Sequence, residues 1–460
     1  MMELFRQTQT GGVQMKIVSK RRKGIVSKAL ILFLVSAFIL TACGKSDDSN
    51  TPSASGGSGG GDKITISIAH TNVTDDPGAK LFRETLQKFK DAHPNVEIRE
   101  EAVAHDLYRS KMTTLGASGE LPDVFLANGS MLIDYAPKGL VAEWDDLLEQ
   151  DKEWKDGFLQ DAFEDFRIKG KIYGVATQTL SVHLIFYNEE IFKQVGIHAF
   201  PETWKDFEDA IVKLKDAGYI PIAMGNKANV PVGSTLFSTL ADRVTGTQWF
   251  NGLTTGESKF TDPEFIEALK KIQELKNIGA FNPDINSIDE GQRDPLYFNK
   301  KAAMTVSGAW YVGNLIQNAP EDVLNNTKIA ILPSTGGKGE AAAVAGGGGW
   351  SYAINAKLTD AKKATAVELV KTFTNDEYAA AMKKINGFPA RKLTDDGSTA
   401  TAPLTQEYYN LMNRVQLTPI YDIRLAPATV EVIYRGIQSL LAGAASPEDI
   451  AKQAQDSLGK

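Results

Sequence analysis

The chain has 460 residues and a formal net charge of −7, and a length of this order predicts two or three domains. The negative charge disfavours a nucleic-acid partner, because nucleic-acid-binding proteins present a basic surface to the phosphates. The single cysteine, Cys43, excludes an intramolecular disulfide and any metal site that needs several cysteines.

The N-terminal segment has the pattern of a signal peptide. Basic residues between Lys16 and Lys28 precede the uncharged run ALILFLVSAFILTA at 29–42. A membrane-spanning helix needs about 20 apolar residues, whereas the core of a signal peptide needs about 7–15 after a positively charged region. We therefore expect residues 1–42 to be a signal peptide. Met15 is the better start, because the basic region follows it at once.

The end of this segment, Leu40-Thr41-Ala42-Cys43, resembles the lipobox of bacterial lipoproteins, in which the cysteine sulfur carries a diacylglycerol. Residues 43–62 continue as a Gly/Ser-rich tract, which is typical of a flexible linker. The alternative is an ordinary secretory signal with a chance cysteine. The lipobox predicts that Cys43 is the first mature residue. Acyl chains contribute about 0.8 kcal/mol per buried CH₂, so they would hold the protein on the extracytoplasmic face of the cell membrane.

Residues 63–460 are expected to form the folded body. Alternating or short buried apolar runs predict strands, and apolar positions three or four residues apart predict helices. In chain order the expected elements are strand 64–70, helix 78–94, strand 96–103, helix 105–119, strands 122–127, 170–177 and 183–188, helix 203–218, strand 220–224, helices 234–244 and 263–278, strands 301–308 and 328–333, and helices 360–374, 376–385, 404–416, 429–442 and 447–458. Strands that alternate with helices predict an α/β fold with helices on both faces of a mainly parallel sheet.

Short motifs for phosphate, metal or catalysis are incomplete. The Gly-rich stretch 336–340 lacks the G-x-x-x-x-G-K-[ST] pattern. The acidic stretch 284–290 has Ile288 where a calcium loop needs an oxygen ligand. No H-E-x-x-H motif occurs. We therefore expect no cofactor, no bound metal and no catalytic residue, although two carboxylates could still meet in space as in a glycosidase.

Five segments together resemble the extracellular solute-binding proteins of ABC importers, in particular the carbohydrate-binding, maltose-binding-protein-like class. They are LPDVFLANGSMLIDYAPKGLVAEWDDLL (121–148), residues 170–225, FNKKAAMTVSGAWYVGNL (298–315), residues 346–378 and SPEDIAKQAQDSL (446–458). The resemblance covers nearly all of the folded body. One departure is Ala176-Thr177, where the family often has proline.

The resemblance implies a periplasmic-binding-protein-like fold, with two α/β lobes, a hinge and a ligand cleft between the lobes. The N-terminal lobe would contain residues 63–177 and 328–375, and the C-terminal lobe residues 178–327 and 376–460. A monomer of this kind captures a sugar or oligosaccharide and delivers it to the permease subunits of the importer, without chemistry. The alternatives are another solute, such as a polyamine, a phosphate ester or a peptide, a lipid-anchored glycan-cleaving enzyme, or a surface adhesin.

A sugar site needs aromatic rings for the apolar face of a pyranose and planar polar groups for its hydroxyls. Trp310 follows a predicted strand directly, at the sheet edge where open α/β sheets bind ligands. Trp350 follows four glycines, which would let the backbone approach a ligand. The other candidates are Asn72, Asp75, Asn128, Ser130, Gln178, His183, Gly349 and Arg391. Each has a structural alternative, which is core packing for the tryptophans, helix capping for the strand-end residues and a surface cation for Arg391.

Overall fold

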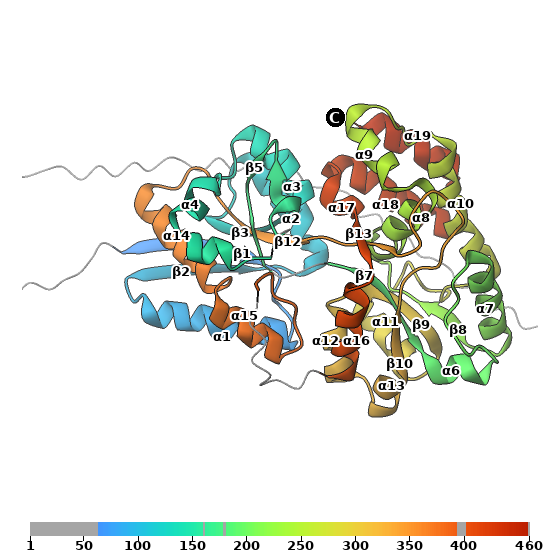
Figure 1. The fold of residues 1–460 in the computed structure, drawn as a ribbon. Coiled ribbons are helices and arrows are strands. Elements are labelled where there is room, and N and C mark those ends of the chain that lie inside the picture. Colours follow the sequence, from blue (N-terminus) through green and yellow to red (C-terminus); the bar gives the residue numbers. More distant parts are fainter. Residues whose placement is uncertain (1–62, 160–161, 178–180, 393–401, 459–460) are drawn as a thin grey trace, which may run out of the picture. The chain divides into compact units, whose positions relative to one another are not determined.

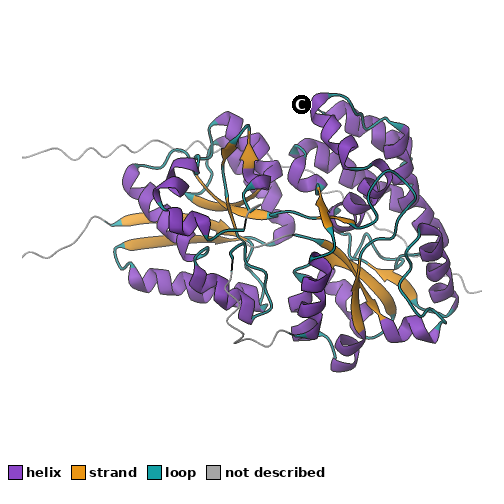
Figure 2. Ribbon diagram, in the orientation of Figure 1, coloured by secondary structure: helices purple, strands orange, loops and turns teal. Residues whose placement is uncertain are grey.

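The computed structural model describes residues 63–159, 162–177, 181–392 and 402–458. The predicted signal peptide, Cys43, the linker and Gln178 lie outside the described residues. The described part is a mixed α/β structure built on two main sheets (Figures 1 and 2), as the sequence predicts. None of its helices combines the length and apolar character that crossing a membrane requires.

The first sheet has five strands in the order β2-β1-β3-β12-β6. Its strands are β1 (Ile64–His70), β2 (Val96–Ala102), β3 (Val124–Asn128), β6 (Val175–Ala176) and β12 (Trp350–Ile354). β1 runs parallel to β2 and β3, and β12 runs antiparallel to β3 and β6. The elements that go with this sheet form the first lobe. Its further elements are α1 (Pro77–Ala92), α2 (His105–Ser118), α3 (Gly129–Tyr135), η1 (Ala136–Lys138), α4 (Asp145–Gln150), α5 (Lys152–Asp156), η2 (Glu164–Phe166), β4 (Arg167–Ile168), β5 (Lys171–Ile172), α14 (Asp360–Thr372) and α15 (Asp376–Lys384).

The second sheet has four strands in the order β10-β7-β9-β8. They are β7 (His183–Asn188), β8 (Ile220–Ala223), β9 (Ala302–Gly308) and β10 (Thr327–Ala330). The elements that go with this sheet form the second lobe. Its further elements are α6 (Glu189–Gln194), α7 (Trp204–Asp216), η3 (Val232–Phe237, a π-helical turn), α8 (Ser238–Thr245), α9 (Thr247–Thr255), α10 (Pro263–Ile278), α11 (Glu290–Phe298), α12 (Tyr311–Asn318), α13 (Glu321–Asn326), β11 (Ala343–Ala345), α16 (Pro403–Met412), β13 (Gln416–Thr418), α17 (Tyr421–Arg424), α18 (Pro427–Ala442) and α19 (Pro447–Ser457).

Helix α7 shows how local sequence fixes an element. The Thr203 side chain accepts a hydrogen bond from the Asp206 backbone N–H at 3.2 Å, which caps the helix. A cap of this kind stabilises a helix by about 1 kcal/mol. Trp204, Phe207 and neighbours at helical spacing are buried in the core of the second lobe. The helix expected at 203–218 is therefore confirmed.

The chain returns to the first sheet later than the sequence predicts. The expected boundary at residue 328 put β10 in the N-terminal lobe. Instead, β10 pairs antiparallel with β7, from Thr327 opposite Asn188 to Ala330 opposite Ile185, so it belongs to the second sheet. Pairing with the first sheet resumes only at β12. Alternation of apolar residues identifies a strand but carries no information about its partner, which explains the error.

Residues 376–392 also depart from the expected boundary, which assigned them to the C-terminal lobe. The Tyr378 ring of α15 packs against Phe373 of α14, with 5.7 Å between ring centroids. Ala390 is buried in the core of the first lobe, and its carbonyl accepts a hydrogen bond from the Leu159 N–H at 3.0 Å. Helix α15 and Ala390 therefore belong to the first lobe, whereas Phe388 between them packs against Tyr408 of α16 in the second lobe, with 4.2 Å between ring centroids. The next described element, α16, packs against β10 of the second lobe.

Candidate ligand-binding cleft

Two adjoining cavities lie between side chains of the two lobes. The Trp350 compartment, of about 300 Å³, is lined by Thr71, Arg109, Ser181, His183, Val230, Pro231, Ser234, Thr235, Glu290, Trp310, Trp350, Ile420, Asp422 and Ile423. The Tyr311 compartment, of about 460 Å³, is lined by Thr74, Asp76, Pro77, Gly78, Glu290, Gly291, Arg293, Asp294, Ala309, Trp310, Tyr311, Gly313, Asn314, Met382, Ile385, Asn386, Gly387 and Phe388. Trp310 and Glu290 line both compartments, so the two cavities form one cleft.

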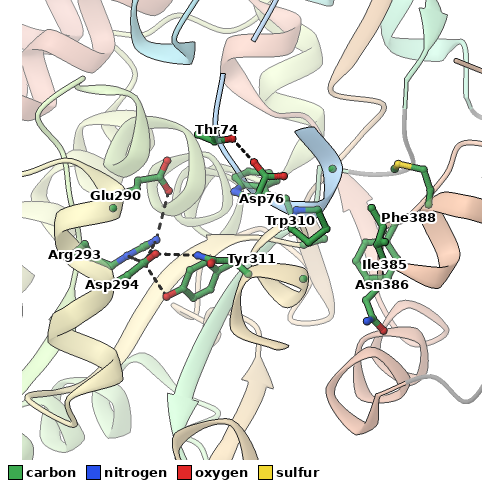
Figure 3. Close-up of a pocket in the computed structure, with 18 residues that line it drawn as sticks. Thr74, Asp76, Glu290, Arg293, Asp294, Trp310, Tyr311, Ile385, Asn386 and Phe388 are labelled. Atoms are coloured by element: carbon green, nitrogen blue, oxygen red, sulfur yellow. Dashed lines mark hydrogen bonds and ion pairs between the residues drawn. The ribbon is translucent and has the colours of Figure 1, made fainter. Parts of the chain in front are cut away.

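Trp310 stands at the junction, where β9 ends and α12 begins. It is 43% exposed, one of few large apolar side chains left open to solvent among the described residues. A Cβ atom on Gly308 would lie 1.9 Å from the indole ring, so the ring folds over the strand end only because residue 308 is glycine. The edge of the His183 ring faces the indole, with 6.2 Å between centroids. The predicted position of Trp310 at a strand end is confirmed, and Figure 3 shows its ring in the Tyr311 compartment.

Trp350 begins β12 and lies opposite Asn128 of β3. The Arg109 guanidinium lies 5.5 Å from the centroid of its ring, and the Tyr108 ring meets it edge-on at 5.8 Å. The structure therefore brings the two predicted tryptophans to the same compartment.

Asp422 and Arg109 form an ion pair between the lobes in this compartment, and the sequence did not single out either residue. Arg109 comes from α2 of the first lobe and Asp422 from α17 of the second. Asp422 Oδ1 also accepts hydrogen bonds from Ser234 Oγ at 2.7 Å and from the Tyr434 hydroxyl at 3.0 Å. Burial alone would raise the pKa of Asp422, but the Arg109 charge and these hydrogen bonds hold it below its ordinary value. The carboxylate is thus ionised at neutral pH.

His183 is the third polar group of the Trp350 compartment. It is 3% exposed, and burial lowers its pKa to about 4 despite the opposing charge of Asp422. The ring is therefore neutral at physiological pH. Its Nδ1 atom has no hydrogen-bond partner in the described part of the chain. The predicted candidate His183 does line the cleft.

The Tyr311 compartment contains a charged network (Figure 3). Arg293, whose side chain is 2% exposed, pairs with Asp294 at 2.8 Å and with Glu290 at 3.8 Å. Its guanidinium also lies 4.6 Å from the centroid of the Tyr311 ring. The Tyr311 hydroxyl donates a hydrogen bond to Asp294 at 2.9 Å. These contacts fix Asp294 and Tyr311 in the wall and leave Glu290 partly exposed beside Trp310.

The four-glycine run approaches protein groups, so its role differs from the expected approach to a ligand. The Gly348 N–H donates a hydrogen bond to the carboxylate of Asp165, and a Cβ on Gly347 would lie 2.1 Å from the same group. Gly349 has φ +67°, and a Cβ there would lie 2.2 Å from Ser181 Oγ. Ser181 lines the Trp350 compartment but Gly349 does not.

Asp165 links this glycine run to the second lobe. Its carboxylate pairs with Arg424 of α17 at 2.6 Å. Burial raises the pKa of Asp165, against the opposing charge of Arg424. The short helix α17 therefore contacts the first lobe through two ion pairs, one from Asp422 and one from Arg424.

Several predicted residues lie outside both compartments. Asn128 is fully buried and caps α3, because its Oδ1 accepts a hydrogen bond from the Met131 N–H at 3.1 Å. Ser130 is buried in α3. Asn72 and Asp75 do not line the cleft either, although Thr71 and Thr74 of the same loop do. Of the two strand-end loops singled out in the sequence, the loop after β1 therefore lines the cleft, through other side chains than those predicted, and the loop after β3 does not line it.

Arg391 is held within the first lobe. Its guanidinium pairs with Asp376, donates to the Trp154 carbonyl at 2.9 Å and lies 5.0 Å from the centroid of the Phe158 ring. It lines neither compartment. Its burial also excludes the simple surface cation that was the alternative.

The residues missed by sequence reasoning are polar side chains on helices and turns. Arg109, Ser234, Glu290 and Asp422 belong to no motif, and only their position in the folded chain brings them together. In the described residues, no group of three His, Cys, Asp or Glu side chains is placed to hold a metal ion.

Residues 74–380 match the family described as bacterial extracellular solute-binding protein. The chain is 22% identical to the diacetylchitobiose binding protein DasA of Streptomyces coelicolor over 384 residues, which cover 80% of this chain and 81% of that protein. It is 26% identical to an uncharacterized ABC transporter extracellular-binding protein of Pyrococcus horikoshii over 243 residues, 51% of this chain and about half (53%) of that protein. A solved structure named chitin oligosaccharide binding protein shares 26% identity and a TM-score of 0.79, covering 86% of this chain and 98% of that one. The resemblance and the fold expected from the sequence are thereby confirmed: this chain belongs to the bacterial extracellular solute-binding protein family.

Proposed function

We propose that this protein is the substrate-binding lipoprotein of an ABC importer, and that it captures a sugar or oligosaccharide in the Trp310 cleft for delivery to the permease. The observation that carries the proposal is the exposed indole of Trp310 between two cavities. Exposure of an apolar ring to water is unfavourable, and stacking of the ring on the apolar face of a pyranose removes it from water and is favourable. The named relatives support the same ligand class, since they bind diacetylchitobiose or chitin oligosaccharide.

Another solute is less well matched by the charges of the cleft. A phosphate ester needs an available arginine or a helix N-terminus, but Arg109 and Arg293 are each paired with a carboxylate. A polyamine needs several carboxylates free to bind it together. The lining does carry more carboxylates than guanidinium groups, but Asp294, Asp422 and Glu290 each contact one of these arginines, and Asp76 caps α1 by accepting a hydrogen bond from the Ala79 N–H. A sugar needs neither kind of surplus charge.

A glycan-cleaving enzyme is also less well matched. Such an enzyme needs a carboxyl group with a raised pKa as general acid. In the Trp350 compartment the Asp422 carboxylate has a lowered pKa instead, because Arg109 and its hydrogen bonds stabilise the ionised form. Binding of the ligand without chemical change is therefore the role that we propose for this member of the family.

The anchor belongs to the same proposal. Lipid on Cys43 would place the folded body on the extracytoplasmic side of the cell membrane, at the end of the linker at 43–62, as a monomer beside the permease. Expression of the full chain in a bacterial host with labelled palmitate tests this part. Label and membrane association should both be lost in Cys43→Ser, and membrane association unchanged in that variant would contradict the anchor.

The binding experiment uses tryptophan fluorescence of residues 60–460, titrated with N-acetylglucosamine, diacetylchitobiose, triacetylchitotriose, xylotriose and maltotriose, followed by product analysis. We expect a saturable change with intact sugar. Trp310→Ala should weaken binding by about 3- to 10-fold or more, since an aromatic pair contributes about 0.5–1.5 kcal/mol beyond its buried area. Trp204→Phe is the matched control, because Trp204 is buried in α7 and lines neither compartment. A cleaved product, or no response to any sugar, would contradict the proposal.

A further inference from the structure

The charged side chains that line the cleft are mostly acidic. They are Asp76, Glu290, Asp294, Asp422, Arg109 and Arg293. Four carboxylates against two guanidinium groups leave the lining with two more negative than positive charges. The family assignment does not decide the charge of the ligand, so this balance carries independent information.

Both guanidinium groups are already engaged. Arg109 pairs with Asp422, and Arg293 pairs with Asp294 and also donates to Thr305 Oγ1 at 3.0 Å. An anionic ligand would have to displace one of these carboxylates. A carboxylate left buried without its cation is strongly destabilising, so that exchange is unfavourable.

Glu290 is placed to act on a ligand in either compartment. It lines both, next to Trp310, and its side chain remains 44% exposed while it contacts Arg293 at 3.8 Å. Figure 3 shows its carboxylate on the same side of the compartment as Asp76 and Thr74 of the first lobe. In the neighbouring compartment, the Nδ1 atom of His183 has no hydrogen-bond partner among the described residues, and the side chain is only 3% exposed. A polar ligand in this compartment could supply that partner.

We infer that the cleft selects against anionic sugars, such as uronic acids and sulfated or phosphorylated sugars, and that Glu290 is the specificity-determining residue. This inference rests on the proposed sugar-binding function and deepens it. Two like charges a few ångströms apart at the edge of a protein repel with an energy that corresponds to about a 10-fold loss of affinity. An uncharged oligosaccharide escapes this loss, because its hydroxyls can donate to the same carboxylates.

Calorimetric titration of residues 60–460 tests the inference with three matched ligands. They are diacetylchitobiose, the same disaccharide oxidised at one C6 to a carboxylate, and the methyl ester of that carboxylate. We expect the carboxylate to bind about 10-fold more weakly than diacetylchitobiose, and the uncharged ester to recover most of that loss. Added salt should strengthen binding of the carboxylate and leave binding of diacetylchitobiose unchanged, because salt screens only the charge repulsion.

In Glu290→Gln the ratio of the two dissociation constants, for the oxidised disaccharide and for diacetylchitobiose, should fall about 3- to 10-fold. The reason is that the oxidised disaccharide should bind more tightly once the Glu290 charge is removed. Glu267→Gln is the control, because Glu267 is similarly exposed at 48%, also pairs with a cation, and lies outside the cleft. Equal affinity of the wild-type protein for the carboxylate and its ester would overturn the inference, as would an unchanged difference in Glu290→Gln. No saturable binding of any neutral sugar would instead overturn the proposed function, and the inference with it.

Discussion

The burial of His183 should make the stability of the protein depend on pH. Burial lowers the pKa of His183 from 6.5 to about 4. Between these two values the unfolded chain binds a proton that the folded protein does not, so the free energy of unfolding must fall as the pH falls. The charged groups that line the same compartment are Arg109, Glu290 and Asp422.

The magnitude follows from the two pKa values. One pKa unit corresponds to about 1.4 kcal/mol. Between about pH 7 and pH 4.5 the folded protein should therefore lose about 2 kcal/mol of its free energy of unfolding through His183 alone. Other titrating groups contribute as well, so the quantity to measure is the difference between the wild-type protein and His183→Gln.

Urea unfolding of residues 60–460, followed by circular dichroism at both pH values, provides that difference. His183→Gln should lose about 2 kcal/mol less than the wild-type protein on acidification. His93→Gln is the control. Burial acts to lower the pKa of His93, but its hydrogen bond to the Phe89 carbonyl and its Glu368 partner outweigh burial and raise the pKa. The raised pKa of His93 stabilises the folded protein at low pH, the opposite of the effect expected for His183. The reasoning about His183 is refuted if His183→Gln and the wild-type protein lose the same stability.

Two further substitutions test the cleft. Gly308→Ala places a methyl group where the Trp310 indole now lies, so the ring should turn away into solvent. Titration with diacetylchitobiose should then show about 3- to 10-fold weaker binding. The free energy of unfolding, measured by thermal unfolding, should change by about 1 kcal/mol or less. Unchanged affinity would show that the ring orientation does not matter. Arg109→Met removes the cation beside buried Asp422 and should lower the free energy of unfolding, measured with urea near neutral pH, by about 3–5 kcal/mol. Without Arg109, burial should raise the pKa of Asp422, so the carboxylate of the variant is protonated and neutral at low pH and the loss of stability becomes smaller. A loss of stability that does not depend on pH would contradict the ion-pair account.

Features fixed by nearby residues could be predicted from the sequence. The cap and apolar face of helix α7 lie within one short segment. Trp310 follows its strand directly, and the placement of the aromatic ring at the sheet edge required only that strand. The two-lobe fold was predictable through the combined motifs of 121–148, 170–225 and the other family segments, which the family match supports.

Features that depend on distant residues could not be predicted. Arg109 and Asp422 are 313 positions apart, and neither lies in a motif. The pairing of β10 with β7 depends on geometry across the sheet, which the alternation of apolar residues does not encode. The four glycines before Trp350 illustrate the same limit, since sequence indicates a close backbone approach but not that Asp165 is the group approached.

The contacts of α17 have a consequence for how such proteins can be recombined. Asp422 pairs with Arg109 and Arg424 with Asp165, so this helix of four residues presents an anion and a cation to complementary partners in the other lobe. A chimaera that takes one lobe from a relative would inherit half of each pair. Unless both partners were transferred together, it would bury unmatched charges at the junction. Exchange of ligand specificity within the family is therefore easier through substitutions in the cleft wall, such as at Glu290, than through exchange of whole lobes.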